Sequence, residues 1–237
     1  GGVRVFGGTF FVFSDYLKGA LRLSALQNLP VTYVFTHDSI AVGEDGPTHE
    51  PIEHLASLRT IPNTYVFRPA DATETQAAWY LSQKTNNRPT SIVLTRQNLP
   101  ILENSSFEKV SKGAYVVYET AVDFDTILIA TGSEVALAID VARELEKDGF
   151  KVRVVSMPSV ELFEEQSKEY KEELLPLNIR RRVSLEMGNS ALWYKYVGLD
   201  GLAIGIDKFG ASAPANKVIE EYGFTVEAVV EKIKNEL

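Results

Sequence analysis

A loop at residues 36–51, with the sequence THDSIAVGEDGPTHEP, holds the densest cluster of side chains that could carry out chemistry. It contains His37, Asp45 and His49, together with glycines that interrupt regular structure. Histidine can transfer a proton near neutral pH or, when charged, bind a phosphate. An aspartate can accept hydrogen bonds from sugar hydroxyls. These residue types predict a site for proton transfer and for binding a hydroxylated anion.

Two other interpretations of this loop remain open. The histidines could be incidental residues of a capped surface loop. Alternatively, His37 and His49 could bind a metal, although no further ligand at a suitable spacing is evident. We therefore expect no metal site within this chain.

A second candidate lies among the aromatic residues near the start of the sequence. Phe10, Phe13 and Tyr16 are spaced three residues apart, which on a helix would place them on one face. Such a stripe is usually part of a hydrophobic core. It could also form a wall on which a flat heteroaromatic ring stacks.

Two further motifs carry weaker signals. The sequence Gly132-Ser133-Glu134 follows an apolar run and could hold a phosphate, but it lacks the full glycine spacing. We interpret it as a tight turn in which Ser133 caps a helix. The arginines at residues 180–182 indicate a solvated or interface feature.

These motifs must be positioned by strands and helices. Short apolar runs at residues 3–6, 31–36, 64–67 and 91–95 predict strands, and residues 14–29 have helical spacing. Asp71 and Glu74 indicate the start of a helix that extends to about residue 84. Buried strands that alternate with helices indicate a mostly parallel sheet covered on both faces.

The same alternation starts again after a polar segment at residues 97–112, which we interpret as a linker. Strands are predicted at residues 126–131, 151–157, 182–187 and 201–207, and helices at 133–148 and 226–237. Gly149 and Thr225 are suited to cap these helices. The sequence thus predicts two consecutive three-layer α/β domains, at residues 1–106 and 107–237.

The composition limits the class of protein. The chain has 237 residues, a formal net charge of −8 and no cysteine. Disulfides and cysteine nucleophiles are therefore excluded, and the acidic balance argues against nucleic acid or an anionic membrane surface as partner. No apolar run approaches the roughly 18 residues of a membrane span. We expect a cytoplasmic location.

The whole chain resembles transketolase. The resemblance is carried by five segments: GGTFFVFSDY, THDSIAVGEDGPTHEP, LTRQNLP, ATGSEVALA and GIDKFGASAPANKVIEEYGFT. The second and the last are highly specific. Dihydroxyacetone synthase is a close relative that these motifs exclude less clearly. The resemblance implies that residues 1–106 are most of a pyrimidine-binding domain and that residues 107–237 are the family's C-terminal domain.

The family resemblance also implies a cofactor and substrates. Transketolases use thiamine diphosphate to move a two-carbon ketol unit between sugar phosphates, at sites shared by the two subunits of a homodimer. It implies that Phe13 stacks on the aminopyrimidine ring, with Phe10 and Tyr16 completing that side of the pocket. A divalent metal, Mg²⁺ or Ca²⁺, would be bound by a pyrophosphate domain that this sequence does not contain.

Four residues are implied to act on the sugar phosphates. His37 and Arg96 would hold the phosphate, for which the planar guanidinium is well suited. Asp45 would hydrogen-bond a hydroxyl group, and His49 would lie near the reacting carbon and assist proton transfer.

The family's activating glutamate is also absent from this sequence. We therefore expect a C-terminal portion of a transketolase that is inactive by itself. The alternatives are one subunit of a naturally split transketolase and a non-catalytic binding or regulatory module with the same fold.

Overall fold

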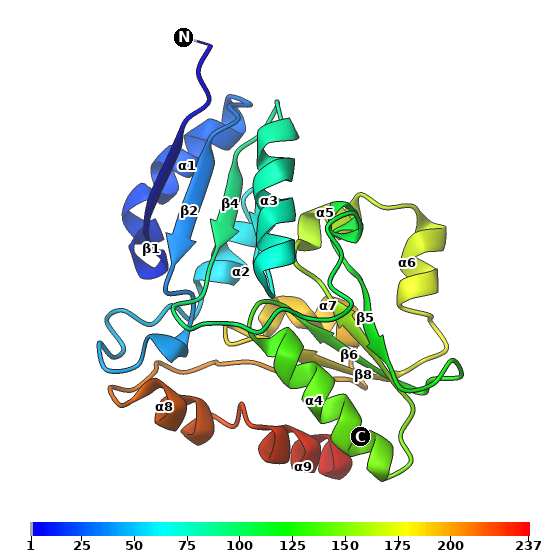
Figure 1. Cartoon of the computed structure of the whole chain (residues 1–237). Helices are drawn as coiled ribbons and strands as arrows, with labels where there is room; N and C mark the ends of the chain where they lie inside the picture. The colour runs from blue at the N-terminus through cyan, green and yellow to red at the C-terminus, as the bar shows by residue number, and fades with distance from the viewer. Residues whose placement is uncertain (1) are drawn as a thin grey trace.

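The computed structural model describes residues 2–237, which form two sheets joined by a well-packed junction (Figure 1). The first sheet contains four parallel strands in the order β1 (Phe6–Phe10), β2 (Thr32–Thr36), β4 (Thr90–Val93) and β3 (Tyr65–Phe67). Helices α1 (Ser14–Leu26) and α2 (His54–Arg59) supply Leu21, Leu55 and Leu58 to one face of this sheet. Helix α3 (Ala72–Lys84) packs Ala77 and Ala78 into the core on the other side.

The second sheet has five strands, of which only the edge strand β5 (Tyr115–Glu119) is antiparallel to its neighbour. The order continues with β7 (Val152–Ser156), β6 (Thr126–Ala130), β8 (Arg181–Leu185) and β9 (Leu202–Ile204). Residues of β6 alternate between two hydrophobic clusters, which shows that both faces of the sheet are covered.

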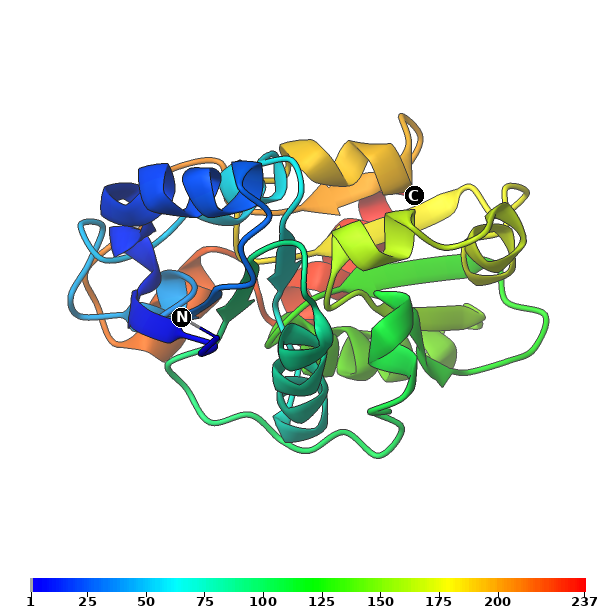
Figure 2. The same ribbon diagram turned by 90° about the horizontal axis from the view of Figure 1, so that it is seen from above.

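Helices cover both faces of this second sheet (Figures 1 and 2). One side carries α4 (Glu134–Lys147) and α9 (Val226–Glu236), which contact each other, and the nearby α8 (Ala215–Glu221). The opposite cluster takes Phe163, Leu174 and Tyr196 from α5 (Val160–Glu164), α6 (Lys168–Leu174) and α7 (Tyr194–Val197). The predicted α/β class, with mostly parallel sheets and helices on both sides, is confirmed.

The first strand is not where the sequence pattern placed it. The apolar residues 3–6 suggested a strand, but β1 runs from Phe6 to Phe10 and includes two glycines. A Cβ atom added to Gly8 would lie 2.9 Å from the carbonyl oxygen of Val34, so the close approach of β2 favours glycine here. The predicted helical stripe of aromatic residues is also wrong. Phe10 ends β1, a short 3₁₀ helix, η1, follows at Phe11–Phe13, and α1 begins at Ser14.

The helix caps predicted from the sequence are mostly present. The Asp71 carboxylate accepts a hydrogen bond from the Glu74 amide at 2.9 Å, and the Thr225 hydroxyl accepts one from the Ala228 amide. Gly149 follows α4 with φ = +86°. The exception is Ser133, whose hydroxyl donates to the Glu134 carboxylate instead of capping α4.

The segment interpreted as a linker is firmly attached to the rest of the protein. It forms one short 3₁₀ helix, η3 (Lys109–Lys112), and buries Leu102 and Val110. The Leu102 amide donates to Asp71 at 3.0 Å. Beyond it, the Tyr115 and Ser156 hydroxyls both donate to the buried Glu74, which joins α3 to the second sheet.

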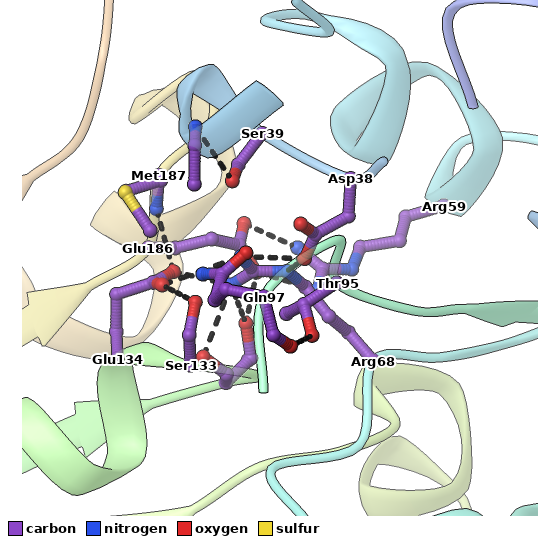
Figure 3. A network of polar contacts seen from close by, with 12 residues as sticks. Asp38, Ser39, Arg59, Arg68, Thr95, Gln97, Ser133, Glu134, Glu186 and Met187 are labelled. Carbon is purple, nitrogen blue, oxygen red and sulfur yellow. Dashed lines mark hydrogen bonds and ion pairs between the residues drawn. The ribbon is translucent and has the colours of Figure 1, made fainter. Parts of the chain in front are cut away.

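A buried network around Arg68 makes a second junction between the sheets (Figure 3). The Arg68 guanidinium donates to Asp38 at 2.9 Å and to Thr131 at 2.9 and 3.0 Å, and it pairs with Glu134. A Cβ atom at Gly132 would lie 2.7 Å from the Arg68 Cζ atom. Gly132 and Glu134 therefore pack against the Arg68 guanidinium, which supports the tight-turn interpretation.

Glu186 extends this network. It accepts two hydrogen bonds of 2.7 Å from Arg59, one from the Trp193 indole and one from the Thr131 hydroxyl. Burial alone would raise the pKa of Glu186, but Arg59 and Arg68 outweigh it and lower the pKa to about 2.

The run of three arginines has a partly structural role. Arg180 is exposed and pairs with Asp200. Arg182, by contrast, is half-buried and donates to main-chain carbonyls of Leu175, Pro176, Ile179 and Tyr196. The expectation of a solvated or interface feature fits Arg180 but is wrong for Arg182.

Candidate functional site

Three neighbouring parallel strands place the candidate residues at one edge of the first sheet. Strand β1 ends at Phe10, β2 ends one residue before His37, and β4 ends three residues before Arg96. Because these strands are adjacent and parallel, their carboxyl ends lie side by side. The fold thus brings together residues that are 86 positions apart in the sequence.

The aromatic residues meet the histidines at this edge. The Phe10 ring stacks on the His37 imidazole with centroids 3.7 Å apart. The Phe13 ring lies edge-on to His49 at 5.5 Å, and it contacts Phe10 at 6.4 Å and Tyr16 at 6.0 Å. Although no single helix carries them, the three aromatic side chains form one continuous group.

This aromatic group remains open to solvent. Tyr16 is 88% exposed, Phe10 is 36% exposed and Phe13 is half-buried. A flat heteroaromatic ring could cover the exposed ring faces and gain apolar contact. The aminopyrimidine ring of thiamine diphosphate therefore fits the chemistry of these residues.

His37 has an unusual backbone conformation and a charged environment. Its φ angle is +63°, a region that side chains other than glycine seldom adopt, and its Nδ1 atom lies 2.9 Å from the Thr36 hydroxyl. Burial lowers the pKa of His37, and the positive charge of Arg96 lowers it further. Asp45 and Asp38 oppose this shift, so Arg96 and Asp45 both act on the same imidazole.

Buried contacts fix the histidine loop, which we define as residues 37–50. Its 3₁₀ helix η2 (Ile40–Val42) is buried, and the Ser39 hydroxyl accepts a hydrogen bond from the Ala41 amide. The Asp38 carboxylate accepts a hydrogen bond from the buried Arg68 guanidinium. Gly43 and Gly46 have φ angles of +84° and +72°, which explains the need for glycine at these two turns.

His49 lies at the far end of this loop. Its Nδ1 atom is 2.9 Å from the Thr48 hydroxyl, and the side chain is half-buried. Its imidazole plane is nearly perpendicular to the Phe13 ring, at an angle of 82°. His49 is thus placed where a ring stacked on Phe13 would come close to its imidazole.

Sequence reasoning gave no role to three residues that support the site. Asp38 and Arg68 form the buried pair that anchors the loop, and Glu50 is a buried carboxyl group at its end. The one available signal was that Asp38 and Arg68 each stand at the end of a β-rich apolar run, where a charge needs a partner.

One group of three potential metal ligands is present in residues 2–237, and it involves neither His37 nor His49. It consists of Asp15, Glu53 and His54. The carboxylates approach opposite ring nitrogens of His54, with Asp15 3.3 Å from Nε2 and Glu53 3.8 Å from Nδ1. One potential ligand atom from each residue lies within 4.8 Å of the others, and exposed acidic groups in such an arrangement are common without an ion.

None of the helices within residues 2–237 is both long and apolar enough to cross a membrane.

Comparisons with known proteins identify the two domains. Residues 1–101 match the family model for the transketolase pyrimidine-binding domain, and residues 113–225 match the model for the transketolase-like C-terminal domain. A protein named probable transketolase, from Streptococcus pneumoniae serotype 4, is 69% identical over 99% of this chain and 36% of its own length.

Two solved structures add detail. A transketolase from Pichia stipitis in complex with sedoheptulose 7-phosphate has a TM-score of 0.92 and 46% identity, covering 98% of this chain and 33% of its own. A structure titled split gene transketolase, inactive beta4 tetramer, has a TM-score of 0.80 and 25% identity. The match covers 98% of this chain and 76% of the split-gene chain.

The chain spans about a third of the length of the curated relatives it matches. Its two sheets correspond in order to the two matched domains. The chain therefore belongs to the transketolase family, of which it carries the pyrimidine-binding and C-terminal domains.

Proposed function

We propose that this chain supplies one half of a thiamine diphosphate-dependent transketolase active site, which moves a two-carbon ketol unit between sugar phosphates. The observation that carries the proposal is the convergence of open aromatic rings, two histidines and an arginine at the carboxyl edge of β1, β2 and β4. Aromatic rings suit the cofactor's pyrimidine, and the cationic and imidazole groups suit a sugar phosphate.

In this proposal the aromatic group holds the cofactor. Phe13 stacks against the aminopyrimidine, while Phe10 and Tyr16 complete the wall of the pocket. When bound, thiamine diphosphate supplies the carbon nucleophile for making and breaking carbon–carbon bonds. The role of the protein residues is to exclude water and to fix the ring against the substrate side of the loop.

The sugar phosphate is then held by residues of three segments. Arg96 and His37 bind the phosphate, and Asp45 accepts a hydrogen bond from a hydroxyl group. His49 is the catalytic residue, since its imidazole can hold or move a proton at the substrate's oxygen. The relative crystallised with sedoheptulose 7-phosphate supports this class of substrate.

The other half of the site comes from outside residues 1–237. We propose that a pyrophosphate domain binds the diphosphate and its divalent metal, Mg²⁺ or Ca²⁺, that a glutamate activates the pyrimidine, and that the working enzyme is a cytoplasmic homodimer of the pentose phosphate pathway. Residues 1–237 alone are then inactive. The inactive split-gene tetramer, which has a similar fold, supports this expectation.

Complementation tests this proposal. Residues 1–237 would be assayed alone and after mixing with a polypeptide that carries the part of the pneumococcal relative not matched here, with thiamine diphosphate, Mg²⁺, a ketose phosphate and an aldose phosphate. We expect no transfer by the chain alone and transfer in the mixture, lost on His49→Asn. Transfer of the ketol unit by the chain alone would contradict the proposal that it supplies only half of the active site. A folded but inactive mixture would favour a non-catalytic module.

A second candidate, a natural subunit of a split transketolase, is favoured by the split-gene structure. The mass of the native polypeptide in source cells, detected with an antibody against this chain, separates the two. A polypeptide near 26.3 kDa would support the split subunit, and a much larger one would assign these residues to a longer enzyme.

A further inference from the structure

The two sequence segments most specific to the family lie against each other in the structure. The chain that leads from β9 to α8 crosses from the second sheet and runs beside the histidine loop, as Figures 1 and 2 both show. Helix α8 contacts η2 of the loop. The C-terminal one of the two, GIDKFGASAPANKVIEEYGFT, supplies no residue to the candidate site.

The contact is close at Gly43, Glu44 and Gly46 of the loop. The Ser212 hydroxyl donates to the Glu44 carbonyl at 2.6 Å. A Cβ atom on Gly43 would lie 3.0 Å from the Ala215 nitrogen, and one on Gly46 would lie 3.0 Å from the Ser212 Cβ atom. Both glycines are therefore packed against the C-terminal domain with no space for a side chain.

Glu50 occupies the centre of this contact. It follows His49 directly and is only 2% exposed. A Cβ atom added to Gly210 would collide with its carboxyl group, so the main chain at Gly210 rests on Glu50. Neither carboxyl oxygen has a hydrogen-bond partner of good geometry, and within residues 2–237 no basic side chain forms an ion pair with it.

The surroundings of Glu50 favour an uncharged carboxyl group. Burial raises the pKa of Glu50 to about 7, while the Ala211 and Gly43 amides oppose the rise. The titratable and charged groups on this side include Tyr222 and Glu221, at the end of α8, and Lys208, whose Nζ atom lies 4.6 Å from the centroid of the Tyr222 ring. Tyr222 donates to the Phe209 carbonyl at 2.6 Å, which holds the segment in place.

We propose that residues 209–213, which we name the brace, fix the position of His49 from the C-terminal domain, and that Glu50 is the positioning residue at this contact. Below pH 7, where the carboxyl group is protonated, the Glu50 side chain fills the space under Gly210 without leaving a buried charge. When the brace is displaced, the chain around His49 loses the surface it rests on. The C-terminal domain thereby takes part in arranging the active-site loop.

The effect on the loop itself does not depend on the proposed function, whereas its catalytic consequence does. The first test therefore needs no cofactor. Amide hydrogen exchange of residues 43–50 would be measured in Gly210→Ala, with Gly19→Ala as the matched control because a Cβ at Gly19 meets no atom within 4 Å. Amides of β6 report whether the fold is intact.

We expect Gly210→Ala to raise exchange of residues 43–50 by about tenfold or more, with β6 unchanged, and Gly19→Ala to leave both unchanged. The wild-type loop should also lose protection as the pH rises through 7, and Glu50→Gln should abolish this step. If Gly210→Ala does not fold, Ser212→Ala and Glu50→Ala are measured in its place. Each should raise exchange of residues 43–50 and leave β6 unchanged. Loop exchange that matches the control in all these variants would overturn the proposal.

The catalytic consequence is tested in the complemented mixture. Glu50→Ala should lower kcat on the order of tenfold and change the KM for sugar phosphate little, because a small displacement of a catalytic group reduces turnover strongly. Glu50→Gln should restore most of the rate and flatten the pH profile near 7. An inactive wild-type mixture would refute the proposed function while the exchange result still decides the brace. Equal kcat in wild type and Glu50→Ala would refute its catalytic part.

Discussion

His37 is the residue whose electrostatic surroundings are most specific. Burial and Arg96 disfavour its charged form, while Asp45 and Asp38 favour it. We expect an NMR titration midpoint below the usual 6.5. Arg96→Ala should raise this midpoint and Asp45→Asn should lower it further. A midpoint that does not rise in Arg96→Ala would show that the two side chains do not interact.

The direction of the pKa shift of His37 also determines how this residue affects folding stability at different pH values. Because the folded-state pKa of His37 lies below the unfolded value, the unfolded chain binds its proton more readily. The contribution of His37 to stability is therefore present above pH 6.5 and decreases as the pH falls below it.

Arg96 is expected to act on binding more than on turnover. In the complemented mixture, Arg96→Ala should raise the KM for a sugar phosphate by about 10- to 100-fold, since hydrogen bonds to charged groups contribute about 1.5–3 kcal/mol. The matched control is Arg143→Ala, an exposed arginine of α4. An equal rise in KM for an unphosphorylated ketose would show that Arg96 does not bind the phosphate.

Among single residues, the sequence pointed to candidates at the open edge of the sheet and gave no role to the buried residues that support them. His37, Asp45 and His49 stood out because their loop follows a β-rich run of a parallel sheet, and Arg96 was named only because it lies in a segment that resembles the family. Asp38, Arg68 and Glu50 could not be identified in this way, because their importance comes from partners that only the folded chain brings near. Nothing in the local pattern of Glu50 reveals Gly210 above it.

Among the elements, strands with continuous apolar residues were predicted well and the exceptions have physical causes. The runs that formed β6 and β7 are almost completely buried, so their residues are mostly apolar on both faces of the sheet whatever their neighbours are. Strand β1 was misplaced because Gly7 and Gly8 suggest a turn, although close packing against β2 favours them. Strand β5 was missed because its antiparallel edge position breaks the alternation of strand and helix.

The junction between the sheets depends on Arg68. Its guanidinium is completely buried among Asp38, Glu134 and Thr131. Arg68→Ala would leave two buried carboxylates without their cation and should destabilise the protein by about 3–5 kcal/mol. Urea unfolding measures this loss. Arg143→Ala, which breaks an exposed pair with Asp140, should cost less than about 1 kcal/mol, and a similar value for Arg68→Ala would contradict the account.

For the whole molecule, the edge strand β1 presents unpaired main-chain groups beside exposed apolar side chains. Val3 is 81% and Phe6 is 71% exposed. Exposed apolar edge strands promote association, so we expect the isolated chain to self-associate with rising concentration. Phe6→Lys should weaken this association in light scattering. A strictly monomeric wild-type chain at all concentrations would contradict it.

The central claim is that the carboxyl edge of the first sheet forms one half of a shared cofactor and substrate site. A crystal structure of the complemented mixture with thiamine diphosphate, Mg²⁺ and a sugar phosphate tests it most directly. We predict the aminopyrimidine ring stacked on Phe13, with ring centroids about 4.5–7 Å apart, and the sugar phosphate group between His37 and Arg96. A cofactor ring bound away from Phe10, Phe13 and Tyr16 would contradict the account.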